Sequence, residues 1–148
     1  MPLTKQEQRV AKLKRRMMVG TEQSPDAELK QAQDVLAWAL RKHGVESAFS
    51  LKAMLDVATQ LGKLDRWEEE IDLRTQIVAG LRQHDPDSVS TAAAEMQLAR
   101  CLAFTERRAE AEPLLRHVVE IRQRELGEDD PETERAQRAL ASVAGPPA

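Results

Sequence analysis

A block of sequence recurs in this chain at an offset of 41 residues, and this repeat restricts the fold more than any other feature. His43 to Ser47 aligns with His84 to Ser88, and a third copy of the block begins at Gly127. The third copy is displaced by four further residues, about one helical turn, so the apolar face of the lengthened helix keeps its direction. A period of this length predicts stacked units that pack on their neighbours. The offset also pairs Ala58 with Ala99, Leu61 with Leu102, Glu69 with Glu110, Leu73 with Leu114 and Ile77 with Val118.

Each unit is predicted to contain two helices. Asp85 to Ser88 supplies acidic residues, Pro and Ser, which favour a helix start, and apolar residues then follow at spacings of three and four. A short polar connection precedes a second helix that begins near Arg108, and Gly127 is a good stop for it. Helix formers dominate the composition and aromatic residues make up only 3%, which argues against a β-sheet fold.

The predicted fold class is therefore all-α, with antiparallel helix pairs stacked into a solenoid. We expect a basic N-terminal arm or capping helix over residues 1–20, a helical repeat domain over residues 21–144 and a flexible tail over residues 145–148. The repeat domain would hold about two and a half repeats and a capping helix. Its helices are expected over residues 26–43, 47–61, 66–83, 89–104, 108–126 and 132–143.

Charge is distributed unevenly along the chain. Residues 1–20 carry six basic side chains and one acidic side chain, whereas the rest carries 16 basic and 24 acidic side chains. The acidic body gives no reason to expect nucleic-acid binding over the whole surface. Cys101 is the only cysteine, which excludes an internal disulfide and fits a reducing compartment. Since neither a signal peptide nor a membrane span is visible, a cytoplasmic location is expected.

The most regular unit resembles the tetratricopeptide repeat family. Its longer variety, of about 42 residues, is typified by kinesin light chain and is common in bacterial proteins. The family reads roughly Glu-Ala-Glu-Pro-Leu, an apolar helix, then Leu-Gly-x-x-His-Pro-x-Thr. The matching segments are Ala109 to Arg116, Glu120-Ile121 and Leu126 to Thr133, with Asp130 in place of the His. The resemblance covers most of residues 26–143.

The resemblance implies a right-handed solenoid and a non-enzymatic adaptor that binds a peptide segment or helix of another protein in a concave groove. Exposed solenoid ends also make self-association an expectation. Three further positions depart from the family pattern. Leu61 and Leu102 replace the usual tyrosine, and Glu70 stands where a small residue is usual. We expect Glu70 to loosen the helix packing or to turn toward solvent.

The resemblance further implies six groove residues: Lys52, Asp56, Gln97, Arg100, Arg135 and Arg138. Asp56 and Gln97 occupy positions where the family often carries an asparagine that pairs with peptide groups. A carboxamide both donates and accepts hydrogen bonds, whereas a carboxylate only accepts. The surrounding cations would suit an acidic or carboxylate-bearing peptide. The alternative is that all six are ordinary solvated positions, since 32% of the residues are charged.

The N-terminal arm has two interpretations. Val10, Leu13 and Met17 share one helical face, with Lys12, Lys14, Arg15 and Arg16 around them. We favour the interpretation that this apolar face caps the open end of the solenoid. The alternative function is a regulatory protein that binds nucleic acid or an acidic partner through this basic arm.

Catalysis is not expected. His43, His84 and His117 form no metal-binding spacing, and the six glycines form no phosphate-binding loop. We expect no catalytic residue, no metal site and no cofactor, and we expect Cys101 to be a small buried hydrophobe.

Overall fold

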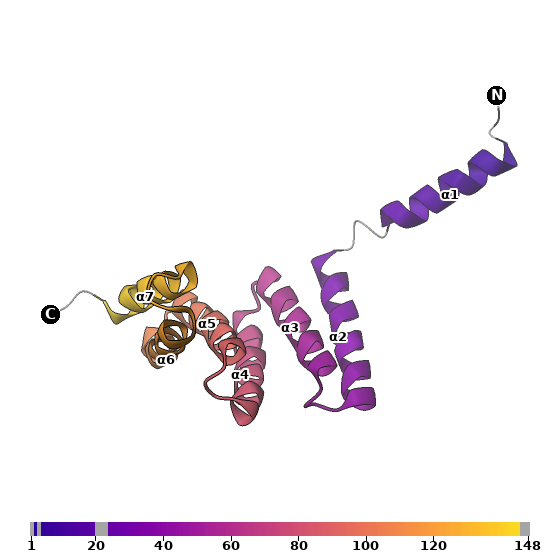
Figure 1. Ribbon diagram of the computed structural model, residues 1–148. Coiled ribbons are helices and arrows are strands. Elements are labelled where there is room, and N and C mark those ends of the chain that lie inside the picture. The colour runs from indigo at the N-terminus through magenta and orange to yellow at the C-terminus, as the bar shows by residue number, and fades with distance from the viewer. Residues whose placement is uncertain (1, 3, 20–23, 146–148) are drawn as a thin grey trace.

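The computed structural model describes residues 2, 4–19 and 24–145, without the side chains of residues 13–19. The described residues form helices and no strand, which confirms the predicted all-α class (Figure 1). None of these helices is long and apolar enough to cross a membrane. Each predicted boundary lies within two residues of the observed one. The helices are α1 (Lys5–Val19), α2 (Pro25–His43), α3 (Ala48–Lys63), α4 (Trp67–His84), α5 (Val89–Phe104), α6 (Arg108–Leu126) and α7 (Pro131–Ala144).

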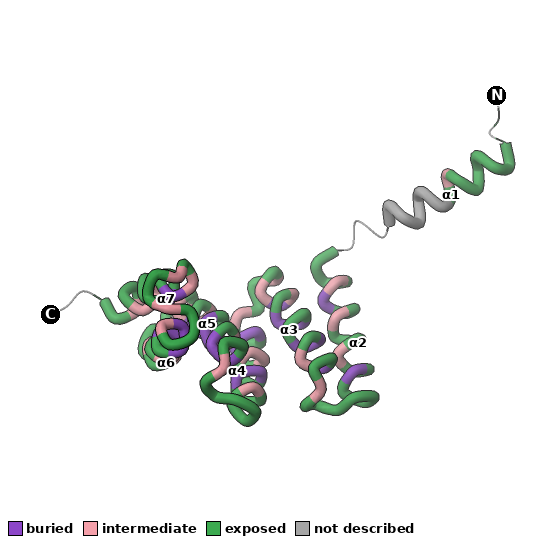
Figure 2. The backbone as a smooth tube through the Cα atoms, viewed as in Figure 1, coloured by how far each residue is buried: buried purple, intermediate pink, exposed green. Residues whose placement is uncertain are grey.

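Helices α2 to α7 pack in chain order, each against the next. Helix α1 takes part in none of these interfaces and stands apart from the other helices (Figure 1). Its described side chains are almost all exposed, whereas buried residues line the facing sides of α3 to α6 (Figure 2). The predicted order of half unit, two full units and last helix therefore describes the packed part of the chain.

The two full units repeat the same turn geometry. Between the helices of each unit, Asp65 and Glu106 adopt positive φ angles of 56° and 64° at equivalent positions. At the start of α3, the Ser47 hydroxyl accepts from the Ser50 amide at 3.0 Å, and Ser88 caps α5 in the same way through Thr91. These caps satisfy amides that the first helical turn leaves unpaired.

A second hydroxyl fixes the chain entering each of these helices. The buried Ser50 hydroxyl donates to the Gly44 carbonyl at 2.6 Å, and the buried Thr91 hydroxyl donates to the Asp85 carbonyl at 2.6 Å. The repeat seen in the sequence is therefore also a repeat of backbone hydrogen bonding.

The prediction that Glu70 turns toward solvent is wrong. The residue is 5% exposed, and its carboxylate accepts a hydrogen bond from the Arg74 guanidinium at 2.8 Å. Space for the carboxylate comes from α3, where Gly62 has no side chain. The wider side chain at position 70 is thus accommodated inside the helix interface by a smaller residue opposite.

Apolar residues form two separate clusters. The larger joins α4, α5, α6 and α7 and contains Met96, Leu115, Val118 and Ile121. The smaller joins α2, α3 and α4 around Leu29, Val57 and Leu61. The N-terminal half of the solenoid therefore has much less core than the C-terminal half.

Candidate functional site

Each unit consists of a first and a second helix, and α3, α5 and α7 are first helices. The six predicted groove residues all lie on these three helices and are all exposed. Lys52 and Asp56 are on α3, Gln97 and Arg100 are on α5, and Arg135 and Arg138 are on α7. The two arginines of α7 already pair within their own helix, with Glu132 at 3.1 Å and Glu134 at 3.8 Å. Among the described residues, no hydrogen bond or ion pair holds the other four.

These side chains belong to one surface, which we call the first-helix face. Equivalent positions of the three helices are all exposed, in three sets: Phe49, Ser90 and Arg135; Lys52, Ala93 and Arg138; Asp56, Gln97 and Ser142. Between these positions every helix carries a small residue, Ala53, Ala94 or Ala139, which is buried or half-buried. Small side chains here allow another chain to approach the helix backbone closely.

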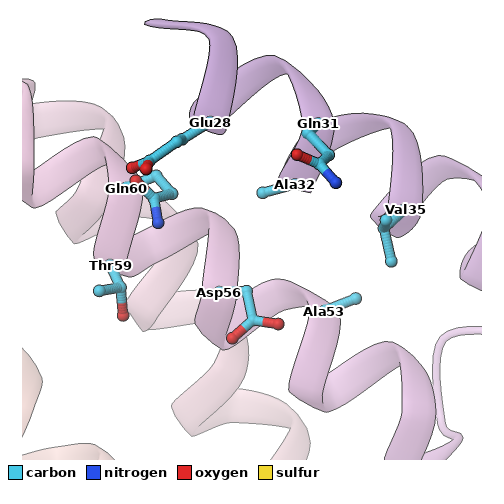
Figure 3. Close-up of a pocket in the computed structure, with 8 residues that line it drawn as sticks. All are labelled: Glu28, Gln31, Ala32, Val35, Ala53, Asp56, Thr59 and Gln60. Atoms are coloured by element: carbon cyan, nitrogen blue, oxygen red, sulfur yellow. The ribbon is translucent and has the colours of Figure 1, made fainter. Parts of the chain in front are cut away.

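A groove of about 370 Å³ lies between α2 and α3 (Figure 3). We call it the α2–α3 groove. Of the six predicted residues, only Asp56 lines it. The Oε1 atom of Gln60 is buried at its wall without a hydrogen-bond partner among the described residues. The lining residues are Glu28, Gln31, Ala32 and Val35 from α2 and Ala53, Asp56, Thr59 and Gln60 from α3.

The charge of this groove differs from the sequence-based prediction. It is lined by the carboxylates of Glu28 and Asp56 and by no basic side chain. Such a lining favours a cationic group. This lining does not support the predicted preference for an acidic peptide at this end of the first-helix face. Sequence reasoning missed Glu28 because it lies on a second helix, and only the packing brings it opposite Asp56.

An exposed aromatic cluster begins one turn beyond Val35 along α2. The rings of Trp38 and Phe49 meet edge to face, with centroids 5.6 Å apart, and His43 lies 5.5 Å from Trp38. Trp38 is 43% exposed and Phe49 is 51% exposed. The cluster therefore extends the α2–α3 groove with an accessible apolar surface.

A second opening, the α3–α4 slot, has a volume of about 380 Å³. Its apolar residues include Leu51, Met54, Ile77 and Leu81, and Gly80 also lines it. A Cβ atom added to Gly80 would meet nothing within 4 Å. In the next unit, Ile121 stands at the equivalent position and is 1% exposed. The slot is thus a gap that the second unit fills with a side chain.

The second unit places a charged network at the position that the slot occupies in the first. The carboxylate of Glu95 is fully buried and is held by Arg82 Nε at 2.9 Å and His117 Nδ1 at 2.6 Å. His117 Nε2 lies 3.1 Å from Asp87. Burial lowers the pKa of His117, but its hydrogen bonds to Glu95 and Asp87 outweigh this effect, so the pKa is raised. The network joins α4, α5 and α6 and is a structural clamp.

The remaining predicted residues show no reactive site. Burial first, and then the carboxylate of Glu70, raises the pKa of Cys101 to about 11, which agrees with an inert thiol. No group of three metal-binding side chains occurs among the described residues. In the basic arm Lys12 is exposed, whereas the side chains of Lys14, Arg15 and Arg16 lie outside the described residues.

Comparison with known proteins matches residues 90–145 to the tetratricopeptide repeat family. This part of the chain is similar to tetratricopeptide repeats. The match covers α5, α6 and α7, the part of the chain with the larger core. No curated protein matches the chain.

Similarity to solved structures extends the tetratricopeptide repeat fold over most of the chain. Two crystal structures of kinesin light chain nearly identical TPR-like repeats from Podosopora anserina, one of them a single-residue variant, align with a TM-score of 0.75. They are 22% identical in sequence, and the alignment covers 89% of this chain. It spans 62% of the length of either solved chain. This similarity shows the fold, and tetratricopeptide repeats generally mediate protein–protein interactions.

Proposed function

We propose that this chain is a non-enzymatic, cytoplasmic adaptor that binds a segment of a partner protein across the first-helix face. The observation that supports this proposal is the equivalence of three helices at that face. Each presents exposed side chains at the same positions, around a small residue that lets a ligand backbone come close. Lys52, Asp56, Gln97 and Arg100 are not engaged elsewhere in the described part of the chain.

The side chains define what such a segment would look like. Gln97 can pair with a peptide group through both its donor and its acceptor. Asp56, which lines the α2–α3 groove together with Glu28, favours a cationic side chain. Arg100 favours a carboxylate, and Arg135 and Arg138 add less because Glu132 and Glu134 already neutralise them. The proposed ligand therefore has a basic end over α3 and an acidic end toward α7.

Site-specific photo-cross-linking tests this proposal. A benzophenone amino acid is introduced at Ala93, which is exposed on the first-helix face, and at Gln137, which is exposed on another face of α7. Irradiation in cells of the source organism should yield a discrete partner adduct from position 93 only. Adducts of equal yield from both positions, or none from position 93, would refute the proposal.

The side-chain requirement is tested in the same assay. The double variant Asp56→Ala, Gln97→Ala should lower the adduct yield at least tenfold. The matched control Asp72→Ala, Gln137→Ala removes the same residue types from exposed positions elsewhere and should leave the yield unchanged. Equal yields from the two double variants would mean that these two side chains do not select the ligand.

A further inference from the structure

Helix α4 shows how a second helix in this chain uses two adjacent faces. Ile71 and Val78 lie in the core cluster with α5, the following helix. Glu70 and Ile77 each lie one position earlier and face the preceding helix, α3. Glu70 contacts Gly62 of α3, and Ile77 lines the α3–α4 slot together with Leu51 of α3. A second helix between two neighbours therefore covers both faces.

Helix α2 covers only one of these two faces. Leu29 and Leu36 have the same spacing of seven residues and pack with Val57 and Leu61 of the following helix, α3. One position earlier are Glu28 and Val35, which line the α2–α3 groove. Val35 is 42% exposed, and no described residue covers this side of α2. The face that should meet a preceding helix is open to solvent.

Helix α1 has the properties that this open face requires. Its sequence pattern is amphipathic, since Val10, Leu13 and Met17 are spaced by three and four residues and basic residues lie between them. It carries a single acidic residue, Glu7, which forms a capping box with Thr4 through hydrogen bonds of 2.7 and 3.2 Å. The helix therefore has its own N-terminal cap, although its described residues form no extensive interface with another helix. Its charge is opposite to that of Glu28 and Asp56 across the groove.

We propose that the α2–α3 groove binds α1 of a second copy of this chain, in a reciprocal dimer. In the structure α1 projects away from its own α2 and α3, with Val10 47% exposed, as an exchanged arm would (Figure 1). Antiparallel packing on α2 would bring Val10 to Val35 and the basic residues to Glu28 and Asp56. Exchange of one element between identical copies closes on itself and gives a two-fold dimer.

Two exchanged helices would bury enough area for a stable dimer. A helix of 15 residues is about 22 Å long and about 10 Å wide. We take about 400 Å² buried on each side of one seated helix, so two reciprocal helices bury about 1,600 Å² in total, the size of a standard stable interface. A single helix folded back on its own chain would bury half of this area.

Sedimentation equilibrium tests the proposal on the full chain. The wild type should be a dimer at micromolar concentration, and its dissociation constant should rise with salt because charges contribute. The double variant Glu28→Lys, Asp56→Lys and a deletion of residues 1–20 should both be monomeric. The control Glu46→Lys, Asp72→Lys changes the net charge equally at exposed positions outside the groove and should remain dimeric. A monomeric wild type would overturn the proposal.

Mixed cross-linking identifies the occupant. One chain carries Val10→Cys and the other Val35→Cys, both with Cys101→Ser, and the mixture is oxidised. The proposal predicts a disulfide-linked heterodimer, whereas replacing the first chain with Gln8→Cys, on the opposite face of α1, should reduce its yield at least fivefold. A cross-link that forms only when both cysteines are on one chain would show that α1 folds back on its own groove, which overturns exchange.

The dimer goes beyond the proposed function and shares Glu28 and Asp56 of the α2–α3 groove with it. The two are separable, because Gln97→Ala should weaken the partner adduct but leave the dimer intact. Deletion of residues 1–20 should abolish the dimer while position 93 still cross-links to its partner. Loss of one property without the other would identify which proposal has failed.

Discussion

The carboxylate of Glu70 occupies the space above Gly62, where a Cβ atom would lie 2.8 Å from its Oε2. The Oε2 atom has no hydrogen-bond partner among the described residues, and Arg74 holds Oε1 at 2.8 Å. The second unit has Ala103, Ala111 and Leu115 at the positions of Gly62, Glu70 and Arg74. The two units thus fill one interface by different means, an ion pair beside a glycine in one and aliphatic side chains in the other.

This relationship predicts that Gly62→Ala destabilises the fold when residue 70 is Glu and stabilises it when residue 70 is Ala. In the wild type the new methyl group displaces a buried, paired carboxylate, and we expect a loss of about 1 kcal/mol in the free energy of unfolding. After Glu70→Ala, the same change only improves helix propensity and should raise the free energy of unfolding by about 0.5–1 kcal/mol. Urea unfolding of the four chains measures this coupling, and additive effects would contradict it.

Protonation of His117 should stabilise the fold. Its folded pKa is raised, so the stabilisation is fully present below the unfolded value near 6.5 and is lost as pH rises through the folded pKa. The urea midpoint of the wild type should therefore fall from pH 6 to pH 8. His117→Gln copies the first unit, which has Gln76 at that position, and should show a flatter profile. Parallel profiles for the two proteins would exclude this role.

Filling the α3–α4 slot should stabilise the chain. Gly80→Ile introduces the side chain that the second unit carries as Ile121, into a space where a Cβ atom meets nothing within 4 Å. Higher helix propensity and partial burial of the new side chain together should raise the free energy of unfolding by about 1–1.5 kcal/mol. Gly80→Ala is the matched control, because it supplies the propensity term without filling the slot. Thermal unfolding that ranks alanine above isoleucine would show that the slot cannot hold the side chain.

Cys101 should react slowly with thiol reagents. With a pKa of about 11, its thiolate fraction at pH 8 is roughly 200-fold below that of a free cysteine with a pKa of about 8.5. We expect a disulfide reagent to modify the folded protein at least 100 times more slowly than the urea-unfolded chain. Comparable rates in the two states would mean that the thiol is exposed to the reagent and ionised.

The sequence predicted the helices well because their limits depend on nearby residues. Ser47 and Ser88 mark helix starts through a bond to an amide three residues on, and the apolar spacing needs only one face of one helix. The six first-helix residues are exposed, as expected for positions on one solvent-facing side of their helices. Periodicity therefore identified helices and faces correctly.

Features that depend on two helices at once could not be read in this way. Glu70 was expected to disrupt its interface, because nothing local indicates that Gly62 lies opposite. The acidic lining of the α2–α3 groove arises from Glu28 and Asp56, which are far apart in sequence. The clamp of Glu95, Arg82 and His117 likewise joins three helices. Complementary charges and compensating side-chain sizes across an interface can be recognised only when the packing of the helices is known.

The division of the core into a large and a small cluster predicts that the two ends of the solenoid differ in local stability. Helices α2 and α3 share only the small cluster, so their amides should exchange with solvent through low-energy local openings, while those of α5 and α6 exchange only on global unfolding. Helices α2 and α3 are thus the compliant end of the solenoid, and the α2–α3 groove can adjust its width to whatever it binds.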